Sequence, residues 1–137
     1  MTQRQDIVSL AEQYRVAASV GRDLQEFCDA SGIDLETVAK PLKLDTDLLQ
    51  KFDVLISFDK MCRLMEALAS ISGDDTFGLK YGQFFKFGGT GAFGLGLLNA
   101  PNFREMLSFY AKYIHITCDI DVYDLTIDNN TARASWT

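Results

Sequence analysis

Three glycines have a spacing that is known from phosphate-binding loops. They lie in Gly89-Thr90-Gly91-Ala92-Phe93-Gly94, which matches the pattern G-x-G-x-x-G. In dinucleotide-binding proteins these glycines let the backbone approach a pyrophosphate at the start of a helix. The surroundings here differ, because the position about 20 residues further on falls inside an expected helix and not at the end of a strand. The sequence also lacks G-K-[ST], which excludes a P-loop. The glycine run therefore favours close packing and a sharp turn over nucleotide binding.

A second candidate for chemistry is His115, the single histidine, with Cys118 three residues after it. Residues three apart in a strand lie on opposite faces, so these two are not expected to form a Cys–His pair. Two interpretations of His115 remain open: a local hydrogen bond where a helix meets a strand, or a polar contact inside a pocket. The three cysteines are odd in number and far apart, which argues against a disulfide framework or a zinc site and for a reduced compartment.

Asp119, Asp121 and Asp124 form a third candidate cluster. Carboxylates on one strand face can offer oxygen ligands to a hard cation. Neither the spacing of an EF-hand nor its turn glycine is present, and a solvated face that protects a strand edge explains the pattern. No metal and no other cofactor is predicted.

Aromatic residues are unusually dense in the second half of the chain. Two helices do not need this many for their core, so the set is either core or the lining of an apolar pocket for a small molecule. The set comprises Phe84, Phe85, Phe87, Phe93, Phe109, Tyr110 and Tyr113. The residues we predict to contact an effector are Phe93, Phe109, Tyr113 and His115.

Helical periodicity and capping residues predict the elements that would position these side chains. The expected helices span about residues 18–31, 35–40, 58–72, 77–81, 91–98 and 103–114. The two strongest are 58–72, with Ser57 as its cap, and 103–114, which begins with an Asn102/Glu105 pair of the capping-box type. Residues 52–56 are expected to be extended or a short strand, and residues 1–16 a short helix or an extended arm.

From Ile116 the apolar residues alternate, which predicts β-strands, and Asp128-Asn129-Asn130 predicts a hairpin turn. The predicted fold class is therefore α+β, with N-terminal helices packed against a C-terminal antiparallel sheet. The chain ends within its last expected strand, so we expect its C-terminal end to be truncated.

The length and the net charge of the chain limit the functions that it can have. A chain of 137 residues is expected to form a single domain over 1–137 with a core of its own. The net charge of −6 and the absence of a basic cluster argue against nucleic-acid binding by this chain alone. The sequence shows neither a signal peptide nor a stretch of about 20 apolar residues that would span a membrane, so a cytoplasmic protein without membrane partners is expected.

An ordered set of short motifs runs along most of the chain. Ser31-Gly32-Ile33 follows the first helix, and Gly73-Asp74-Asp75-Thr76-Phe77-Gly78-Leu79 follows the second strong one. After Gly91-Ala92-Phe93-Gly94 comes the segment Ala100–Leu107, A-P-N-F-R-E-M-L. This set resembles the N-terminal regulatory domain of one branch of AraC-type transcription regulators, with its G-D-x-x-F-G-L and A-P-T-L-R-E-A-L signatures. Asn102 and Met106 depart from the common residues without disturbing the start of the helix.

The resemblance implies a bacterial regulatory domain that senses an unknown small-molecule effector and forms a homodimer. In that family a helix-turn-helix domain follows, so DNA would be contacted only through a domain that this chain lacks. The alternative is a protein-interaction module without a ligand, in which the surplus aromatic residues serve core and interface. An enzyme is not expected. The pocket residues of the family are too variable to carry over, and the four site residues named above rest on aromatic and polar content alone.

Overall fold

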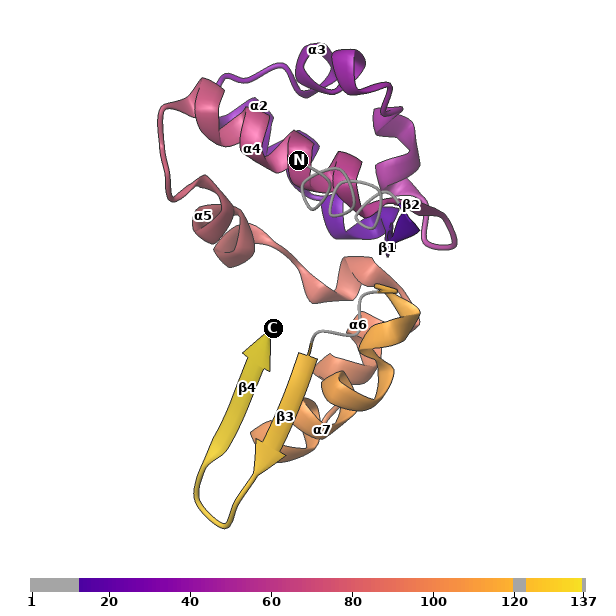
Figure 1. The fold of residues 1–137 in the computed structure, drawn as a ribbon, viewed down its shortest axis with the longest axis vertical. Helices are drawn as coiled ribbons and strands as arrows, with labels where there is room; N and C mark the ends of the chain where they lie inside the picture. The colour runs from indigo at the N-terminus through magenta and orange to yellow at the C-terminus, as the bar shows by residue number, and fades with distance from the viewer. Residues whose placement is uncertain (1–12, 120–122, 137) are drawn as a thin grey trace, which may run out of the picture.

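The computed structural model describes residues 13–119 and 123–136, which form an N-terminal and a smaller C-terminal part (Figure 1). In the N-terminal part the elements are β1 (Arg15–Ala17), the 3-10 turn η1 (Ala18–Gly21), α2 (Leu24–Ala30), α3 (Leu35–Ala39), η2 (Lys40–Leu42), η3 (Thr46–Gln50), β2 (Leu55–Ser57), α4 (Phe58–Ser72) and α5 (Phe77–Phe84). In the C-terminal part they are η4 (Phe87–Thr90), α6 (Ala92–Leu98), α7 (Phe103–Tyr113), η5 (Ile114–Ile116), β3 (Tyr123–Ile127) and β4 (Ala132–Trp136). The α+β class predicted from the sequence is confirmed.

Helix α4 is the centre of the N-terminal part and has the bounds that the sequence predicted. The Ser57 hydroxyl accepts a hydrogen bond of 3.2 Å from the backbone N–H of Lys60 at its start. Gly73 ends it with a φ of 66°, a left-handed conformation that glycine adopts without strain. Its apolar face buries Met61, Leu64 and Leu68.

The helix expected over 18–31 is wrong in its first part. Residues Ala18–Gly21 form a 3-10 turn, and a regular helix begins only at Leu24. The side chain of Asp23, which could have capped that helix, instead accepts a hydrogen bond of 2.8 Å from the backbone N–H of Lys86. The side chain of the residue before α2 is therefore used in a contact with a residue distant in the sequence and not in capping the helix.

Strand β1 lies between two segments. It pairs antiparallel with β2, with Val16 opposite Ile56, and forms an isolated bridge to Cys118 on its other side. The 117–119 segment belongs to the C-terminal part, so β1 connects the two parts. The strand predicted from Ile116 is wrong at its start, because Ile114–Ile116 forms a 3-10 turn. The carbonyl of Ile114 accepts hydrogen bonds from the N–H groups of residues 117 and 118. Residues 120–122 of that expected strand lie outside the described residues, as do residues 1–12 of the expected arm.

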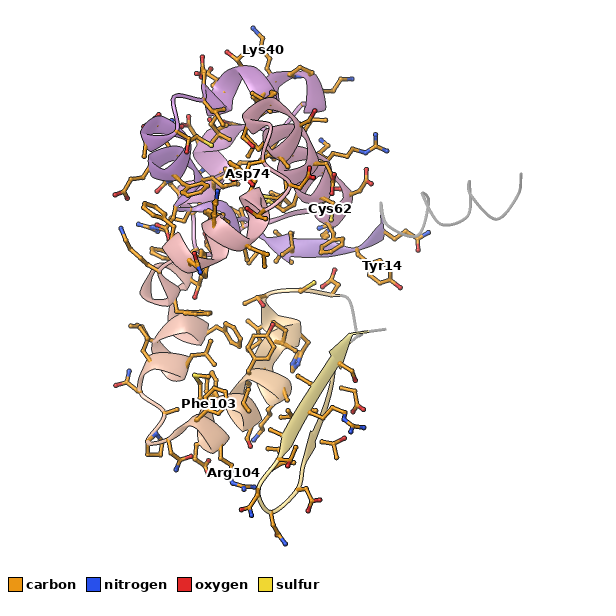
Figure 2. The ribbon with its side chains drawn as sticks, turned by 90° about the vertical axis from the view of Figure 1, so that its left-hand side faces the viewer. Tyr14, Lys40, Cys62, Asp74, Phe103 and Arg104 are labelled. Atoms are coloured by element: carbon orange, nitrogen blue, oxygen red, sulfur yellow. The ribbon has the colours of Figure 1, made fainter. Side chains whose placement is uncertain are left out.

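The C-terminal part consists of α6, α7 and a β-hairpin that runs beside α7 (Figure 1). Strands β3 and β4 pair antiparallel from Tyr123 opposite Trp136 to Ile127 opposite Ala132, which confirms the hairpin turn predicted at 128–130. Figure 2 shows Arg104 reaching from α7 toward this turn, where its Nη2 donates to the carbonyl of Asn129 at 3.0 Å.

Burial is distributed unevenly between the two parts. The described members of the buried apolar cluster all lie between Val16 and Tyr81, and Leu24, Leu35, Leu64 and Leu68 are fully buried. In contrast, no residue of α7 (103–113) is buried, although its pattern is strongly amphipathic. The apolar face of α7 is therefore half-buried and not part of the fully buried core.

Candidate functional site

The segment that joins the two parts, residues 85–91, is held against the N-terminal part by side chains of the η1–α2 turn. Besides the bond from Asp23 to Lys86, the guanidinium of Arg22 lies 4.4 Å from the ring centre of Phe52 and donates from Nη1 to the Gln50 carbonyl at 3.2 Å. A Cβ at Gly89 would lie 3.1 Å from Cδ of Arg22, so glycine allows this close approach. The bond from Lys86 to Asp23 and the contact of Gly89 with Arg22 therefore hold the joining segment against the N-terminal part, while Phe52 and Gln50 position the Arg22 side chain.

Glycine in α6 serves packing. A Cβ at Gly94 would overlap the carbonyl oxygen of Phe87, and one at Gly96 would overlap the ring of Phe109. Gly91 has a φ of 75°, which is strained for any other residue. The three glycines of the G-x-G-x-x-G pattern are thus explained by the approach of Arg22 to Gly89, the positive φ of Gly91 and the packing of η4 onto α6 at Gly94, which agrees with the packing role that the sequence favoured.

A cavity of about 280 Å³ opens where the two parts meet, and we call it the junction cavity. It lies between η1 and α5 on one side and α6, α7 and η5 on the other. The N-terminal part contributes Val20, Tyr81, Gly82 and Phe85. The C-terminal part contributes Phe87, Thr90, Phe93, Tyr110, Ile114 and Thr117.

A second cavity of about 300 Å³ lies between α6, α7 and the hairpin, and we call it the hairpin cavity. Its lining is Phe87, Leu97, Leu98, Met106, Leu107, Tyr110 and Ala134. Phe87 and Tyr110 line both cavities, so the two are neighbours with a shared wall. Met106, Leu107 and Tyr110 of α7 are half-buried and form one wall of the hairpin cavity.

The walls of the junction cavity carry three hydroxyl groups besides that of Tyr110, and all three donate to main-chain carbonyls. Tyr81 Oη donates to Val20 at 2.6 Å, Thr90 Oγ1 to Phe87 at 2.6 Å and Thr117 Oγ1 to Ile114 at 2.9 Å. Burial, reinforced by the charge of Asp23, raises the pKa of Tyr81 well above its usual range, so its phenol stays protonated. The lining residues include no charged side chain.

The four residues predicted from the sequence have different positions. Phe93 lines the junction cavity, and its ring centre lies 5.8 Å from that of Tyr110. Phe109 and Tyr113 line a separate groove of about 380 Å³ along α6 and α7, with their ring centres 4.6 Å apart. His115 is exposed in η5 and lines neither cavity. The structure brings Phe93 and Phe109 together at 6.0 Å but does not bring His115 to them.

Several lining residues are not among the four predicted effector contacts, and the sequence contained a signal for only some of them. Met106, Leu107 and Tyr110 lie on the predicted apolar face of 103–114, and Phe85 and Phe87 belong to the aromatic set. Nothing local distinguishes Val20 or Tyr81 from core residues.

Other reactive groups of the described residues lie elsewhere. Burial, with a contribution from Asp29, raises the pKa of the Cys28 thiol to about 11, which keeps it protonated and unreactive. Among residues 13–119 and 123–136, His, Cys, Asp and Glu side chains form no group of three that could hold a metal ion.

Of the described helices, none has the length and apolar character needed to cross a membrane.

Comparison with known proteins gives one family match. Residues 21–137 match the model of the arabinose-binding domain of AraC transcription regulator, N-terminal. The chain belongs to this family. The match includes the lining of the hairpin cavity and, except for Val20, that of the junction cavity. It identifies a ligand-sensing regulatory domain of a transcription regulator, which is not an enzyme class. No curated protein sequence matches the chain.

Proposed function

We propose that this AraC-family domain binds its effector in the junction cavity. The observation that carries the proposal is that the cavity is bounded by elements from both parts, with Tyr81 on one side and Phe93 on the other. A ligand there contacts both parts at once. Its binding therefore favours one relative arrangement of the two, in proportion to its difference in affinity for the arrangements.

The output of this change is control of DNA binding by a helix-turn-helix domain. The full chain of 137 residues has a net charge of −6, which suits a regulatory module and not a phosphate-binding surface. The β3–β4 hairpin and η5 lie next to the cavities, so they are the elements that would transmit an effector-dependent change. A regulator of this kind acts where the DNA is, and we place it in the bacterial cytoplasm.

A thermal-shift screen of the chain against amino acids, sugars, fatty acids and aromatic compounds tests the proposal. A ligand at 100 times its Kd stabilises the folded state by about 2.7 kcal/mol, which corresponds to several degrees for a domain of this size. We expect at least one class to give such a shift. If a cooperatively folded chain shows no shift with any class, the effector proposal is wrong.

The second part of the proposal is self-association. Leu95 on α6 is 52% exposed and Phe103 at the start of α7 is 68% exposed, and both belong to the part of the chain with few buried residues. Because α6 and α7 contact each other, these exposed apolar side chains are candidates for an interaction surface. This observation also supports the alternative, a module that associates without any ligand.

Sedimentation velocity at several concentrations tests the self-association. We expect a dimer whose dissociation constant increases at least tenfold in the double variant Leu95→Ser/Phe103→Ser. Leu79→Ser is the matched control, because Leu79 is 75% exposed but lies on α5 in the N-terminal part. A monomer at all concentrations, or equal weakening by the control, would contradict the assignment.

A further inference from the structure

The chemistry of the junction cavity restricts what it can bind. Five of its ten lining residues are aromatic, namely Tyr81, Phe85, Phe87, Phe93 and Tyr110. They come from α5, the joining segment, α6 and α7, so rings surround the cavity on several sides. None of the lining residues is charged, so a charged group held inside would have no counter-ion.

The polar groups of the walls are a poor match for a sugar. The hydroxyl protons of Tyr81, Thr90 and Thr117 are already donated to main-chain carbonyls. Those hydroxyls can still accept hydrogen bonds, but a sugar presents several hydroxyl groups that each need donors as well as acceptors. A polar group that leaves water without finding partners weakens binding.

Size and ring geometry indicate the ligand. An engineered cavity of about 150 Å³ lined by Leu, Ile and Phe binds benzene, and the junction cavity is 280 Å³. Phe85 and Phe87 pack edge to face with ring centres 5.4 Å apart. A flat ligand can add a further edge-to-face or offset contact to these rings, which is the favoured geometry of aromatic pairs.

We propose that the effector is an uncharged, largely aromatic molecule about the size of two fused rings, bound in the junction cavity. This inference rests on the proposed function, because it names the chemical class of the ligand for the same site. It predicts that a small aromatic compound binds where a sugar does not, even though the family is described as arabinose-binding.

Indole and L-arabinose serve as the probes, measured by titration calorimetry and thermal shift on the full chain. The blocking variant is Gly82→Phe. Gly82 lines the cavity, and a Cβ added there meets no atom within 4 Å, so the new ring can enter or cover the cavity without a clash. Gly78→Phe is the matched control, since Gly78 lies one turn earlier on α5, has the same open space and lines neither cavity.

We expect indole to bind the wild type and Gly78→Phe with similar affinity, and Gly82→Phe at least tenfold more weakly. Cooperative melting of both variants shows that they are folded. Equal binding of indole to Gly82→Phe would place it elsewhere and overturn the inference. Arabinose binding that Gly82→Phe blocks, without any indole binding, would overturn the ligand class but leave the proposed function standing. If neither these probes nor any library compound binds, the proposed function fails as well.

Discussion

At the scale of single residues, two buried polar side chains form hydrogen bonds to the main chain of segments distant in the sequence. Asp23 is buried and accepts from the N–H of Lys86, and Tyr81 is buried and donates to the carbonyl of Val20. Both bonds join segments more than 60 residues apart in the sequence. Each therefore adds to tertiary stability in a way that no local pattern encodes.

We predict that Tyr81→Phe lowers the free energy of unfolding by about 1 kcal/mol, the usual net contribution of one hydrogen bond. The ring remains, so its packing against Phe27, with ring centres 5.7 Å apart, is kept. Urea denaturation followed by circular dichroism measures the change. An unchanged midpoint would mean that water replaces the hydroxyl at the Val20 carbonyl without loss.

Asp74 gives a prediction about acid stability. Hydrogen bonds from Lys80 and from the side chain and main chain of Thr76 lower the pKa of this carboxyl from 3.8 to about 2. A lowered pKa in the folded state contributes stability that is complete above the unfolded pKa and is lost as the pH falls toward 2.

We therefore expect Asp74→Asn to be less stable than the wild type at pH 6, with a difference that shrinks between about pH 4 and pH 2. Urea midpoints of both proteins at pH 6, 4, 3 and 2 measure this. A difference that stays constant over the whole range would show that the charge of Asp74 does not stabilise the fold.

At the scale of elements, α6 is a short helix whose glycines allow contact with η4 on one side and α7 on the other. Gly94 faces the Phe87 carbonyl and Gly96 faces the Phe109 ring. Glycine in a helix costs about 1 kcal/mol relative to alanine, so its presence here is explained by these close approaches. The element that carries Phe93 to the junction cavity is thus positioned by residues without side chains.

Two glycine substitutions should therefore have opposite effects. Gly94→Ala is expected to destabilise the chain by 1 kcal/mol or more, because its Cβ overlaps a main-chain oxygen and overpacking costs about 1–3 kcal/mol. Gly78→Ala on α5 has open space and is expected to stabilise by up to about 1 kcal/mol. Thermal melts of the two variants beside the wild type measure both signs. A stabilising Gly94→Ala would contradict the packing of α6 on η4.

At the scale of the whole molecule, the buried core lies in the N-terminal part, and the cavities lie in the C-terminal part and where the two parts meet. The fully buried leucines belong to α2, α3, η3 and α4, and α7 has no buried residue between 103 and 113. Local unfolding is easiest where few apolar side chains are buried. An effector that fills a cavity would supply some of the missing contacts, which is how binding can order one part more than the other.

This uneven burial predicts uneven hydrogen exchange. Amide protons of α4 should exchange most slowly, and those of α7, β3 and β4 should exchange faster, through openings that leave the N-terminal part folded. Exchange measured by mass spectrometry on peptides covering α4 and α7 compares the two directly. Equal protection of the two helices would mean that the parts unfold as one cooperative unit.

The sequence by itself determined the elements whose signals are local. The bounds of α4 and the start of α7 agree with the predictions because Ser57 and Asn102 cap the helices and the apolar residues repeat at helical spacing. The turn at 128–130 followed from its residues, and the family from short motifs in order along the chain. The use of glycine in 89–94 for packing was also evident, because the surroundings of the motif did not fit a nucleotide site.

Only the tertiary structure decided the rest. The periodicity of 103–114 shows that one face of the helix is apolar but not that this face lines cavities, because a helix pattern does not name its partner. Asp23, at the break of 18–31, bonds to Lys86, and β1 lies between β2 and Cys118, contacts that join residues far apart in the sequence. The junction cavity combines Tyr81 with Phe93 and Tyr110, residues from three helices, and only the packing of those helices brings them to one site.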